Sequence, residues 1–353
     1  MDEKIIQKII ESNLDKNKEY SFKFRLDDQK EWDIFFKNLK VSLVNYSNQE
    51  LNYQLLHRKE KNIYEKEYSF IFFKKSKAIA IMPFTISKIL TKKEYEISSH
   101  GLPMLAPIFS DSISLQEKKN FIETIFKIIK DLSDHLNIKK IIGCENFLDK
   151  DGISDWYLFI KKMSFKIESI NEGYIDLTRS FEEIELSLRK KKILYDVNKA
   201  KNLWNTSIKY KLSVDEWLEF KDLHKSVSGK KTRSDKTWES QFQDINNGNA
   251  FVIFIYNNKK IIGGAMYRFS NSMALYAIGA YDRSLYPKPI SHLAHYLAIN
   301  ELKKNNFKWL KMGEIPNIED YNNPSPKEVS IGLFKKKFSS HIFTKKIYNF
   351  IFK

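Results

Sequence analysis

Apolar and polar residues follow two periods along this chain, and the two periods alternate in the same order twice. Apolar residues recur at helical spacing from about residue 116 to 136, where Phe121, Ile125 and Leu132 fall on one face. Period-two runs and short continuous apolar runs predict strands. In the first half, strands are predicted at residues 22–25, 68–73, 77–87, 95–99, 138–142 and 165–170, and helices at 28–39, 116–136 and 156–160, with residues 1–20 forming a charged amphipathic helix or an arm.

The second half repeats this order of elements. Asn257-Asn258 is a good turn pair between its first two strands. Strands are predicted at residues 251–256, 260–269, 273–281, 307–312 and about 340–350, and helices at 290–304 and near 329–337. Both halves therefore read hairpin, strand, helix, strand, helix, strand, although their residues are not similar.

Two or three helices are predicted between the halves. Ser180 and Glu183 form one capping-box pattern, and Ser213 and Glu216 form a second. A third helix is predicted to begin near Asp235 and to end at a glycine. Helices and strands in this order predict an α+β fold with mixed sheets flanked by helices, and 353 residues suggest two such units at about 150 residues each.

The composition predicts a protein with a sizeable core. Hydrophobic residues make up 42% of the chain and charged residues 29%, which excludes wholesale disorder. No uncharged apolar run approaches the ~18 residues of a transmembrane helix, and the N-terminus has no signal-peptide pattern. The single cysteine, Cys144, leaves no disulfide framework and no cysteine-rich zinc site. We expect a cytoplasmic protein without a metal site or a tightly bound cofactor.

The net charge of +16 is concentrated in three segments. Residues 186–211, 221–237 and 333–353 carry net charges of +7, +4 and +6, so the rest of the chain is close to neutral. A local basic field of this kind is typical of surfaces that recruit phosphates or nucleic acid. The alternative is a set of solvated helix faces.

Several short motifs of the second half occur in an order that resembles a known family. They are Leu188-Arg189-Lys190-Lys191-Lys192, Gly263-Gly264-Ala265, Tyr276–Ala280 followed by Asp282, Pro289-Ile290-Ser291-His292, Lys311-Met312-Gly313 and Phe334-Lys335-Lys336-Lys337-Phe338. Together they resemble the Fem family, which consists of tandem acyl-CoA N-acyltransferase (GNAT) units and includes the aminoacyltransferases that build peptidoglycan cross-bridges. The resemblance covers residues 20–350 and is specific over about 180–340.

This resemblance implies a fold and an activity. It implies an N-terminal GNAT-like unit at residues 1–175 and a C-terminal one at 176–353 that carries a basic groove. It further implies transfer of an acyl or aminoacyl group to an amino group of a cell-envelope glycan, nucleotide-linked sugar or peptidoglycan precursor. The donor stays open between acyl-CoA and aminoacyl-tRNA, because the family's coiled-coil arm and the ordinary acetyl-CoA signature are both missing. Transfer RNA and a peripheral contact with a membrane are further expected partners.

The resemblance also implies site residues. It places the family's functional lysine at Lys335, whose charge could stabilise an oxyanion or hold the terminal phosphate of the donor. Tyr276 and Asp282 flank a strand and could orient or deprotonate the acceptor, although sheet core and turn are the plainer roles. The glycines Gly263 and Gly264 could mark a bulge whose amide binds the oxyanion, or could merely allow close packing.

Three further residues are candidates for binding substrate. Arg233, in a loop beside a basic helix, has the planar fork that suits a diphosphate, and Arg189 carries the same argument. His292, near a helix N-terminus, could bind a carboxylate or phosphate. The alternative function is a non-catalytic RNA-binding or interaction protein that uses the basic patch, but the sequence contains no standard RNA-binding motif.

Overall fold

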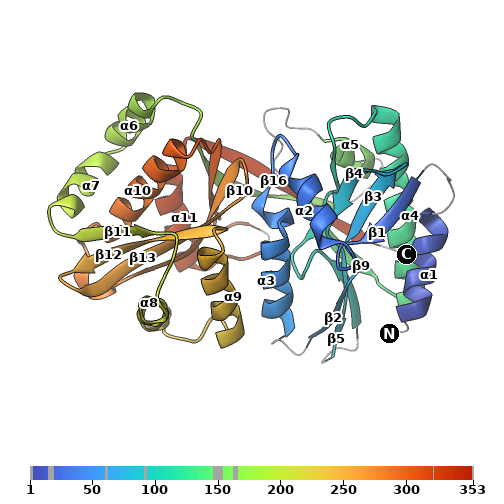
Figure 1. The fold of residues 1–353 in the computed structure, drawn as a ribbon, viewed down its shortest axis with the longest axis horizontal. Helices are drawn as coiled ribbons and strands as arrows, with labels where there is room; N and C mark the ends of the chain where they lie inside the picture. Colours follow the sequence, from blue (N-terminus) through green and yellow to red (C-terminus); the bar gives the residue numbers. More distant parts are fainter. Residues whose placement is uncertain are drawn as a thin grey trace. The chain divides into compact units, whose positions relative to one another are not determined.

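The computed structural model describes residues 3–14, 20–59, 63–90, 94–145, 154–161, 166–320 and 322–351, and the chain divides into two compact units (Figure 1). Unit 1 consists of residues 1–41, 45–169 and 345–353, and unit 2 of residues 42–44 and 170–344. The predicted α+β class is confirmed. The division into domains of residues 1–175 and 176–353 stays a prediction.

Unit 1 contains five helices and nine strands within its described residues. The helices are α1 (Glu3–Leu14), α2 (Gln29–Lys37), α3 (Asn48–Lys59), α4 (Leu115–Leu136) and α5 (Asp155–Lys161). The strands are β1 (Tyr20–Phe24), β2 (Ile63–Glu67), β3 (Phe70–Lys74), β4 (Lys77–Met82), β5 (Thr85–Ile89), β6 (Glu94–Ser98), β7 (Met104–Leu105), β8 (Ile108–Phe109) and β9 (Lys140–Cys144). A short 3-10 helix, η1 (Val44–Tyr46), lies where the chain passes between units.

The strands of unit 1 form small sheets with local pairing. β1, β3, β4 and β8 form one sheet, and β2, β5 and β6 form another. The single strand predicted at 77–87 is two strands, because Pro83 has no N–H for a ladder and separates β4 from β5. The helix α3 has no counterpart in the prediction, since its sequence is polar and has little helical periodicity.

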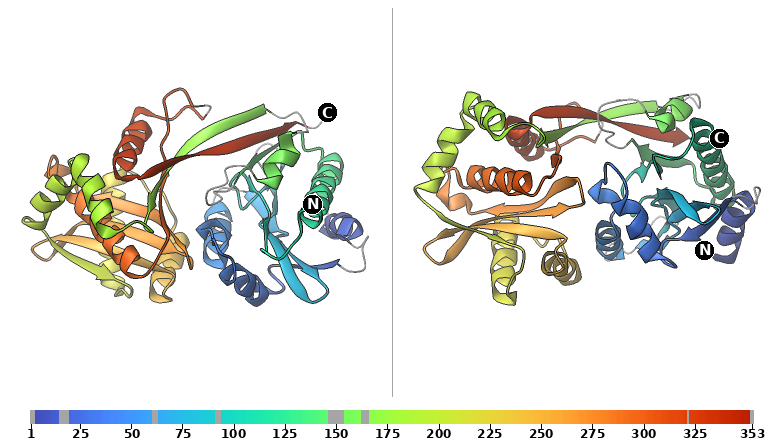
Figure 2. Two further views of the ribbon diagram at one scale, coloured as in Figure 1. Left: turned by 90° about the horizontal axis from the view of Figure 1, so that it is seen from above. Right: turned by 45° about the horizontal axis from the view of Figure 1, so that its top comes forward.

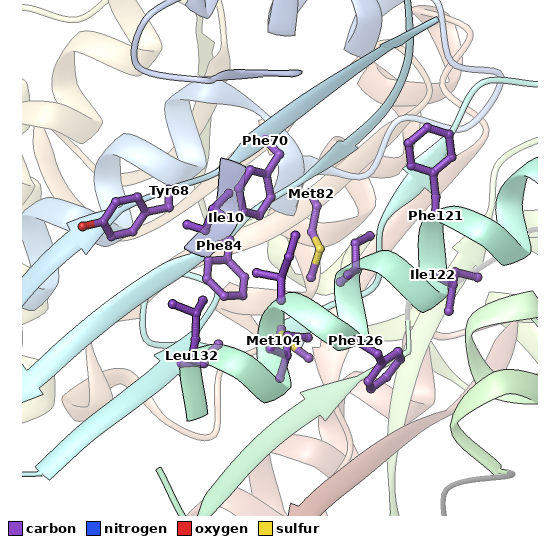
Figure 3. Packing of buried hydrophobic residues seen from close by; sticks show 14 of the residues in the cluster. Ile10, Tyr68, Phe70, Met82, Phe84, Met104, Phe121, Ile122, Phe126 and Leu132 are labelled. Atoms are coloured by element: carbon purple, nitrogen blue, oxygen red, sulfur yellow. The ribbon is translucent and has the colours of Figure 1, made fainter. Parts of the chain in front are cut away.

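The long helix α4 supplies most of the helical contribution to the core of unit 1. It begins at the capping box of Ser114 and Glu117, and its inward face buries Phe121, Ile122 and Phe126. These side chains pack against Phe70 and other apolar residues of β3 and β4 (Figure 3). The period-3.6 pattern therefore predicted both the extent and the buried face of this helix.

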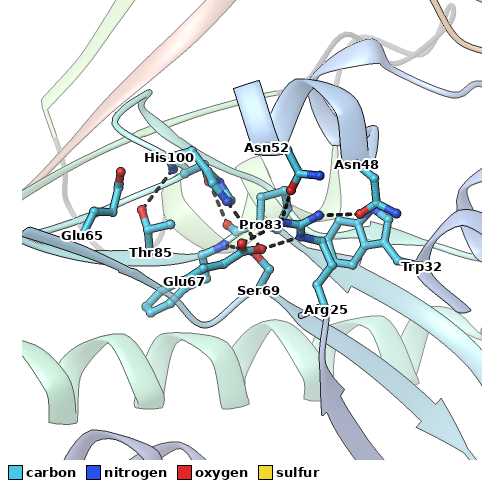
Figure 4. Close-up of polar contacts among 12 residues, drawn as sticks. Arg25, Trp32, Asn48, Asn52, Glu65, Glu67, Ser69, Pro83, Thr85 and His100 are labelled. Carbon is cyan, nitrogen blue, oxygen red and sulfur yellow. Dashed lines mark hydrogen bonds and ion pairs between the residues drawn. The ribbon is translucent and has the colours of Figure 1, made fainter. Parts of the chain in front are cut away.

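A buried ion pair lies beside this core (Figure 4). Arg25 is fully buried and donates to both carboxylate oxygens of Glu67 at 2.5 and 2.6 Å. Asn48 accepts a further bond from the guanidinium, and the His100 ring lies 3.4 Å from the same carboxylate. Burial raises the pKa of Glu67, but the hydrogen bonds from Arg25 and His100 outweigh it and lower that pKa to about 2.

Unit 2 is a twisted sheet with helices on both faces (Figures 1 and 2). Its helices are α6 (Phe181–Lys190), α7 (Ile193–Lys201), α8 (Val214–Ser228), α9 (Asp235–Asn246), α10 (Ile290–Lys304) and α11 (Pro326–Phe338), with the 3-10 helix η2 (Arg283–Leu285). Its strands are β11 (Asn205–Lys209), β12 (Ala250–Asn257), β13 (Lys260–Phe269), β14 (Met273–Tyr281) and β15 (Trp309–Glu314). β10 (Lys166–Asp176) and β16 (His341–Ile351) have residues in both units.

The sheet order in unit 2 is β11-β12-β13-β14-β15-β10. Side chains of β12 alternate between two cores, so that Phe251 and Ile253 pack with α6, α7 and α10, whereas Val252 and Phe254 pack with α8 and α9. Both predicted capping boxes, at Ser180 and Ser213, are present. The region between the halves contains four helices, because Lys192 adopts a left-handed conformation that separates α6 from α7.

We predict that Glu67→Gln lowers the stability of the protein by about 3 kcal/mol at pH 7, because Arg25 would then be buried without its counter-charge. A carboxyl whose pKa falls from 4.5 to about 2 on folding contributes stability that is complete above pH 4.5 and is lost as the pH falls toward 2. Chemical denaturation from pH 2 to 7 should therefore show a shallower acid loss in the variant. Glu123→Gln, on the exposed side of α4, is the control and should change neither quantity; equal effects of both substitutions would contradict the role of the pair.

Candidate active site

The parallel strands β14 and β15 separate after a short stretch of pairing. Met273, Ala274 and Leu275 face Trp309, Leu310 and Lys311, and no further pair is formed between these two fully described strands. Beyond that point, residues 276–279 of β14 and 312–314 of β15 form the two arms of what we call the fork. Along the fork, the edge of β14 that faces β15 and the edge of β15 that faces β14 are not paired with each other, although both strands lie in the middle of a sheet.

A β-bulge in each strand explains the separation. Across β13, Met266 faces Ile278 and Tyr267 faces Tyr276, so Ala277 is an extra residue in β14. Across β10, Gly173 faces Gly313 and Tyr174 faces Lys311, so Met312 is an extra residue in β15. Because a bulge bends its strand and leaves the extra residue outside the ladder, bulges at these two positions turn the strands apart.

Helix α11 brings Lys335 to the β15 arm of the fork. A Cβ built on Gly313 would lie 3.0 Å from the Lys335 Nζ, and Gly313 has a φ of +101°. The ammonium group therefore lies directly over a backbone position that has no side chain. Lys335 is half-buried, whereas Lys336 and Lys337 are exposed, because successive helical residues point about 100° apart.

The charges around Lys335 act in opposite directions on its pKa. Burial lowers the pKa of the Lys335 amine, and Lys311 lowers it further, whereas Glu314 and Glu172 oppose this shift. Lys311 is already bound by Glu172, with 2.7 Å between its Nζ and the carboxylate, and Tyr174 donates to the same carboxylate. The exposed carboxylate of Glu314, which follows Gly313, is therefore the remaining counter-charge near Lys335.

A buried histidine lies on the α10 side of the fork. His295 is fully buried, and its Nδ1 lies 2.7 Å from the Tyr267 hydroxyl. Its Nε2 has no hydrogen-bond partner among the described residues. Burial lowers the pKa of His295 to about 3, with further repulsion from His292 and Lys335, so the ring is neutral at pH 7.

The tyrosine predicted as a site residue lies at the fork. Tyr276 is the first residue of β14 beyond the paired stretch, and its ring stands edge-on to His295 at 4.6 Å between centroids. Its hydroxyl occupies the space over Gly279, where a Cβ would lie 1.7 Å away. Burial raises the pKa of Tyr276 to about 12, so this hydroxyl is a proton donor at neutral pH and not a base.

Other predicted site residues make packing or capping contacts. A Cβ on Gly263 would meet Ile290 of α10, and one on Gly264 would meet Phe220 of α8, so this pair allows close packing of helices on both faces. Asp282 caps η2 through two bonds to Ser284, which lower the pKa of its carboxyl. A carboxylate held in its ionised form in this way is a weak base, and this geometry gives its predicted catalytic role no support.

The basic residues of the predicted groove lie on different faces of the sheet. Arg233 contacts the His224 ring at 3.2 Å and lies over Trp238, on the α8–α9 face. Arg189 is exposed in the last turn of α6, on the opposite face with Lys335. His292 lies 3.6 Å from Asp196 and edge-on to Phe334 of α11. A single groove containing Arg189, Arg233 and Lys335 is therefore not formed on unit 2.

Sequence reasoning missed the features that shape the fork. A bulge at Ala277 or Met312 is invisible to hydrophobic periodicity, since neither residue is unusual in a strand. His295 was not among the predicted site residues. Among the described residues, no group of three or more His, Cys, Asp or Glu is arranged to hold a metal ion. None of the described helices has both the length and the apolarity needed to cross a membrane.

No protein-family model matches the sequence, and no curated protein matches it. Among solved structures, the chain is similar to the crystal structure of FemX, with a TM-score of 0.65 and 13% identity over 92% of this chain and 96% of that one. The chain has a Fem-like tandem GNAT fold. Two further similar structures are a conserved protein of unknown function from Bacteroides thetaiotaomicron VPI-5482 (TM-score 0.58, 12% identity, 93% and 98% covered) and L-PGS from Bacillus licheniformis (0.52, 12%, 86% and 91%).

The Fem-like fold confirms the resemblance seen in the sequence motifs, at the level of the fold. Coverage above 90% of both chains means that the likeness to FemX extends over both units and not over one GNAT-like half. At 13% identity the likeness establishes the fold alone. The roles of individual residues therefore rest on the geometry of the fork.

We predict that Gly313→Ala displaces the Lys335 ammonium by a few tenths of an ångström, because the new methyl group would lie 3.0 Å from the Nζ. The matched control is Gly248→Ala, since Gly248 also has a positive φ of +75° but nothing within 4 Å of its Cβ position. Both substitutions should cost about 1 kcal/mol of stability through the left-handed backbone. Only Gly313→Ala should change the rate at which acetic anhydride labels Lys335, measured by mass spectrometry; equal labelling in both variants would show that Gly313 does not position the lysine.

Proposed function

We propose that this protein is an N-acyltransferase of the Fem-like GNAT type and that the fork of unit 2 is its reaction centre. The observation that carries the proposal is the half-buried ammonium of Lys335 over Gly313, beside strand edges that the sheet leaves free. Acyl transfer needs stabilisation of a developing oxyanion more than it needs a nucleophilic side chain. A half-buried cation beside strand edges that the sheet leaves unpaired could supply that stabilisation.

The proposed chemistry proceeds through a tetrahedral intermediate. The acceptor nitrogen forms a bond to the carbonyl carbon of the donor, and the π electron pair moves onto the carbonyl oxygen. Lys335 and the backbone around the Ala277 bulge stabilise the resulting oxyanion. The oxyanion then collapses, the bond to the leaving thiolate or ribose oxygen breaks, and the proton lost by the acceptor nitrogen ends on the leaving group. Glu314, exposed beside Lys335, is the proposed carrier of this proton.

The substrates follow from the family resemblance. The proposed acceptor is an amino group of a cell-envelope glycan, nucleotide-linked sugar or peptidoglycan precursor, and the proposed donor is an acyl-CoA or an aminoacyl-tRNA. The similarity to FemX and L-PGS supports this class through the fold. We place the reaction in the cytoplasm, in line with the nucleotide-linked acceptors that the family resemblance implies.

We predict that Lys335→Ala reduces turnover by roughly 10²–10³-fold, which is the usual effect of removing one oxyanion donor. Stability should change little, because the side chain is only half-buried. The assay is formation of acylated acceptor, detected by mass spectrometry, with a panel of acyl-CoA and aminoacyl-tRNA donors and nucleotide-linked amino sugars.

Lys336→Ala and Lys337→Ala are the matched controls for this experiment. Both residues belong to the same lysine run and are exposed, so each removes the same charge without reaching the fork. Their turnover should remain close to that of the unmodified protein. If all three substitutions reduce turnover equally, the run acts only as an electrostatic surface and Lys335 has no catalytic role.

A second prediction distinguishes the two classes of donor. Binding of an aminoacyl-tRNA should weaken steeply with salt, because every neutralised phosphate releases a counterion. An acyl-CoA held by one or two phosphate contacts should show a much shallower dependence. Affinities measured for both donors between 50 and about 200 mM salt decide between them, and a lack of binding by both at low salt would remove the proposal.

A further inference from the structure

Unit 1 contains a cavity far along the chain from the residues of the fork. It has a volume of about 590 Å³, which is within the range of small-molecule sites. Its walls come from the turn between β3 and β4, the loop before α4 and the first turn of α4 itself. The lining residues are Lys74, Lys75, Ser76, Lys77, Ile79, Ser112, Ile113 and Glu117.

The cavity has an excess of positive charge. Three lysines line it against one carboxylate, and that carboxylate, Glu117, is bound to Lys74 at 2.5 Å. The hydrogen bonds from Lys74 and Ser114 lower the pKa of Glu117 to about 2, so it is fully ionised and compensates Lys74. Lys75 and Lys77 are left without an ion pair among the described residues.

A serine hydroxyl lies beside Lys77. The Nζ of Lys77 is 3.4 Å from the Ser112 Oγ, and Ser112 in turn contacts Ser110 at 3.0 Å. Ammonium and hydroxyl donors that converge on one cavity match the oxygen atoms of a phosphate group. Asp111, next to Ser112, does not line the cavity and lies 3.4 Å from Lys40, which offsets part of its charge.

The N-terminus of helix α4 does not by itself explain an attraction for anions at this cavity. Its first turn is already capped, since Ser114 accepts from the Glu117 backbone N–H and Glu117 bonds back to Ser114. The attraction for an anion therefore comes from Lys75, Lys77 and the serine hydroxyls. The apolar floor of Ile79 and Ile113 leaves room for an uncharged part of a ligand.

We propose that this cavity of unit 1 binds the phosphate group of a small phosphorylated molecule, with Lys75, Lys77 and Ser112 as its ligands. The site is independent of the proposed acyl transfer, because none of its residues belongs to unit 2. Inorganic phosphate, pyrophosphate and the diphosphate of a nucleotide share the required chemistry.

Calorimetric titration of the full-length protein with phosphate, pyrophosphate and ADP at low salt tests the proposal. Pyrophosphate should bind, and Lys75→Gln and Lys77→Gln should each weaken its binding about tenfold, because each removes one charge-assisted contact. Tighter binding of ADP than of pyrophosphate would identify a nucleotide as the source of the phosphate. Equal affinities would identify a free polyphosphate.

Lys127→Gln is the matched control, since Lys127 is an exposed lysine on the same helix, outside the cavity. It should leave binding unchanged. Labelling of the unmodified protein with acetic anhydride gives a second measurement, in which pyrophosphate should protect Lys75 and Lys77 but not Lys127. The absence of binding by all three anions, or equal losses in the cavity and control variants, would overturn the proposal.

Discussion

β14 and β15 are hydrogen-bonded neighbours over only three residue pairs, because each strand contains an extra residue within the next two positions. The other features of the candidate active site depend on this separation. If the two strands stayed paired, their backbone groups would be used within the sheet, and an ammonium over Gly313 would face a closed ladder. The bulges at Ala277 and Met312 thus convert the interior of a sheet into a place where backbone and side-chain donors can meet a substrate.

Packing around the fork fixes the side chains that face it. Tyr276 lies over Gly279 and against His295, and the His295 ring is held by Tyr267. Phe334, one residue before Lys335, packs against both His292 and His295. The aromatic contacts between α10 and α11 therefore set the position from which Lys335 reaches Gly313. This arrangement holds the lysine through packed rings, which are stiffer than a chain of surface ion pairs.

The sequence predicted the elements better than the geometry between them. Strong periodicity located β14 and α10 at their observed ends, and capping boxes located the starts of α6 and α8, because these signals are local. The polar helix α3 was missed, since its burial against the rest of unit 1 leaves no periodic trace in its sequence. Within the site, motif order led to Lys335 and Tyr276, and both lie at the fork.

The predicted site residues that the structure does not bring to the fork share a cause. Gly263, Gly264 and Asp282 were selected for what their residue types can do, but their surroundings assign them to packing and capping. Arg233 and Lys335 are both basic and both belong to basic segments, yet the sheet lies between them. Residue type limits the chemistry that is available, whereas strand register and the face of the sheet decide which residues can act together.

On unit 2, the basic residues that would attract a polyanionic donor differ from the one ammonium group proposed to act in the reaction. Lys209 and Lys221 belong to the basic segments, and both are already paired with carboxylates, Glu216 and Asp235. Such partly exposed pairs at the surface contribute little individually and are screened by salt, so the basic segments act as a diffuse field on both faces of the sheet. Lys335 differs because burial lowers the pKa of its amine, and a charge withdrawn from water acts at short range through a medium of lower dielectric constant. A polyanionic donor would respond to the whole field, whereas the bond-making step would respond to this one ammonium group.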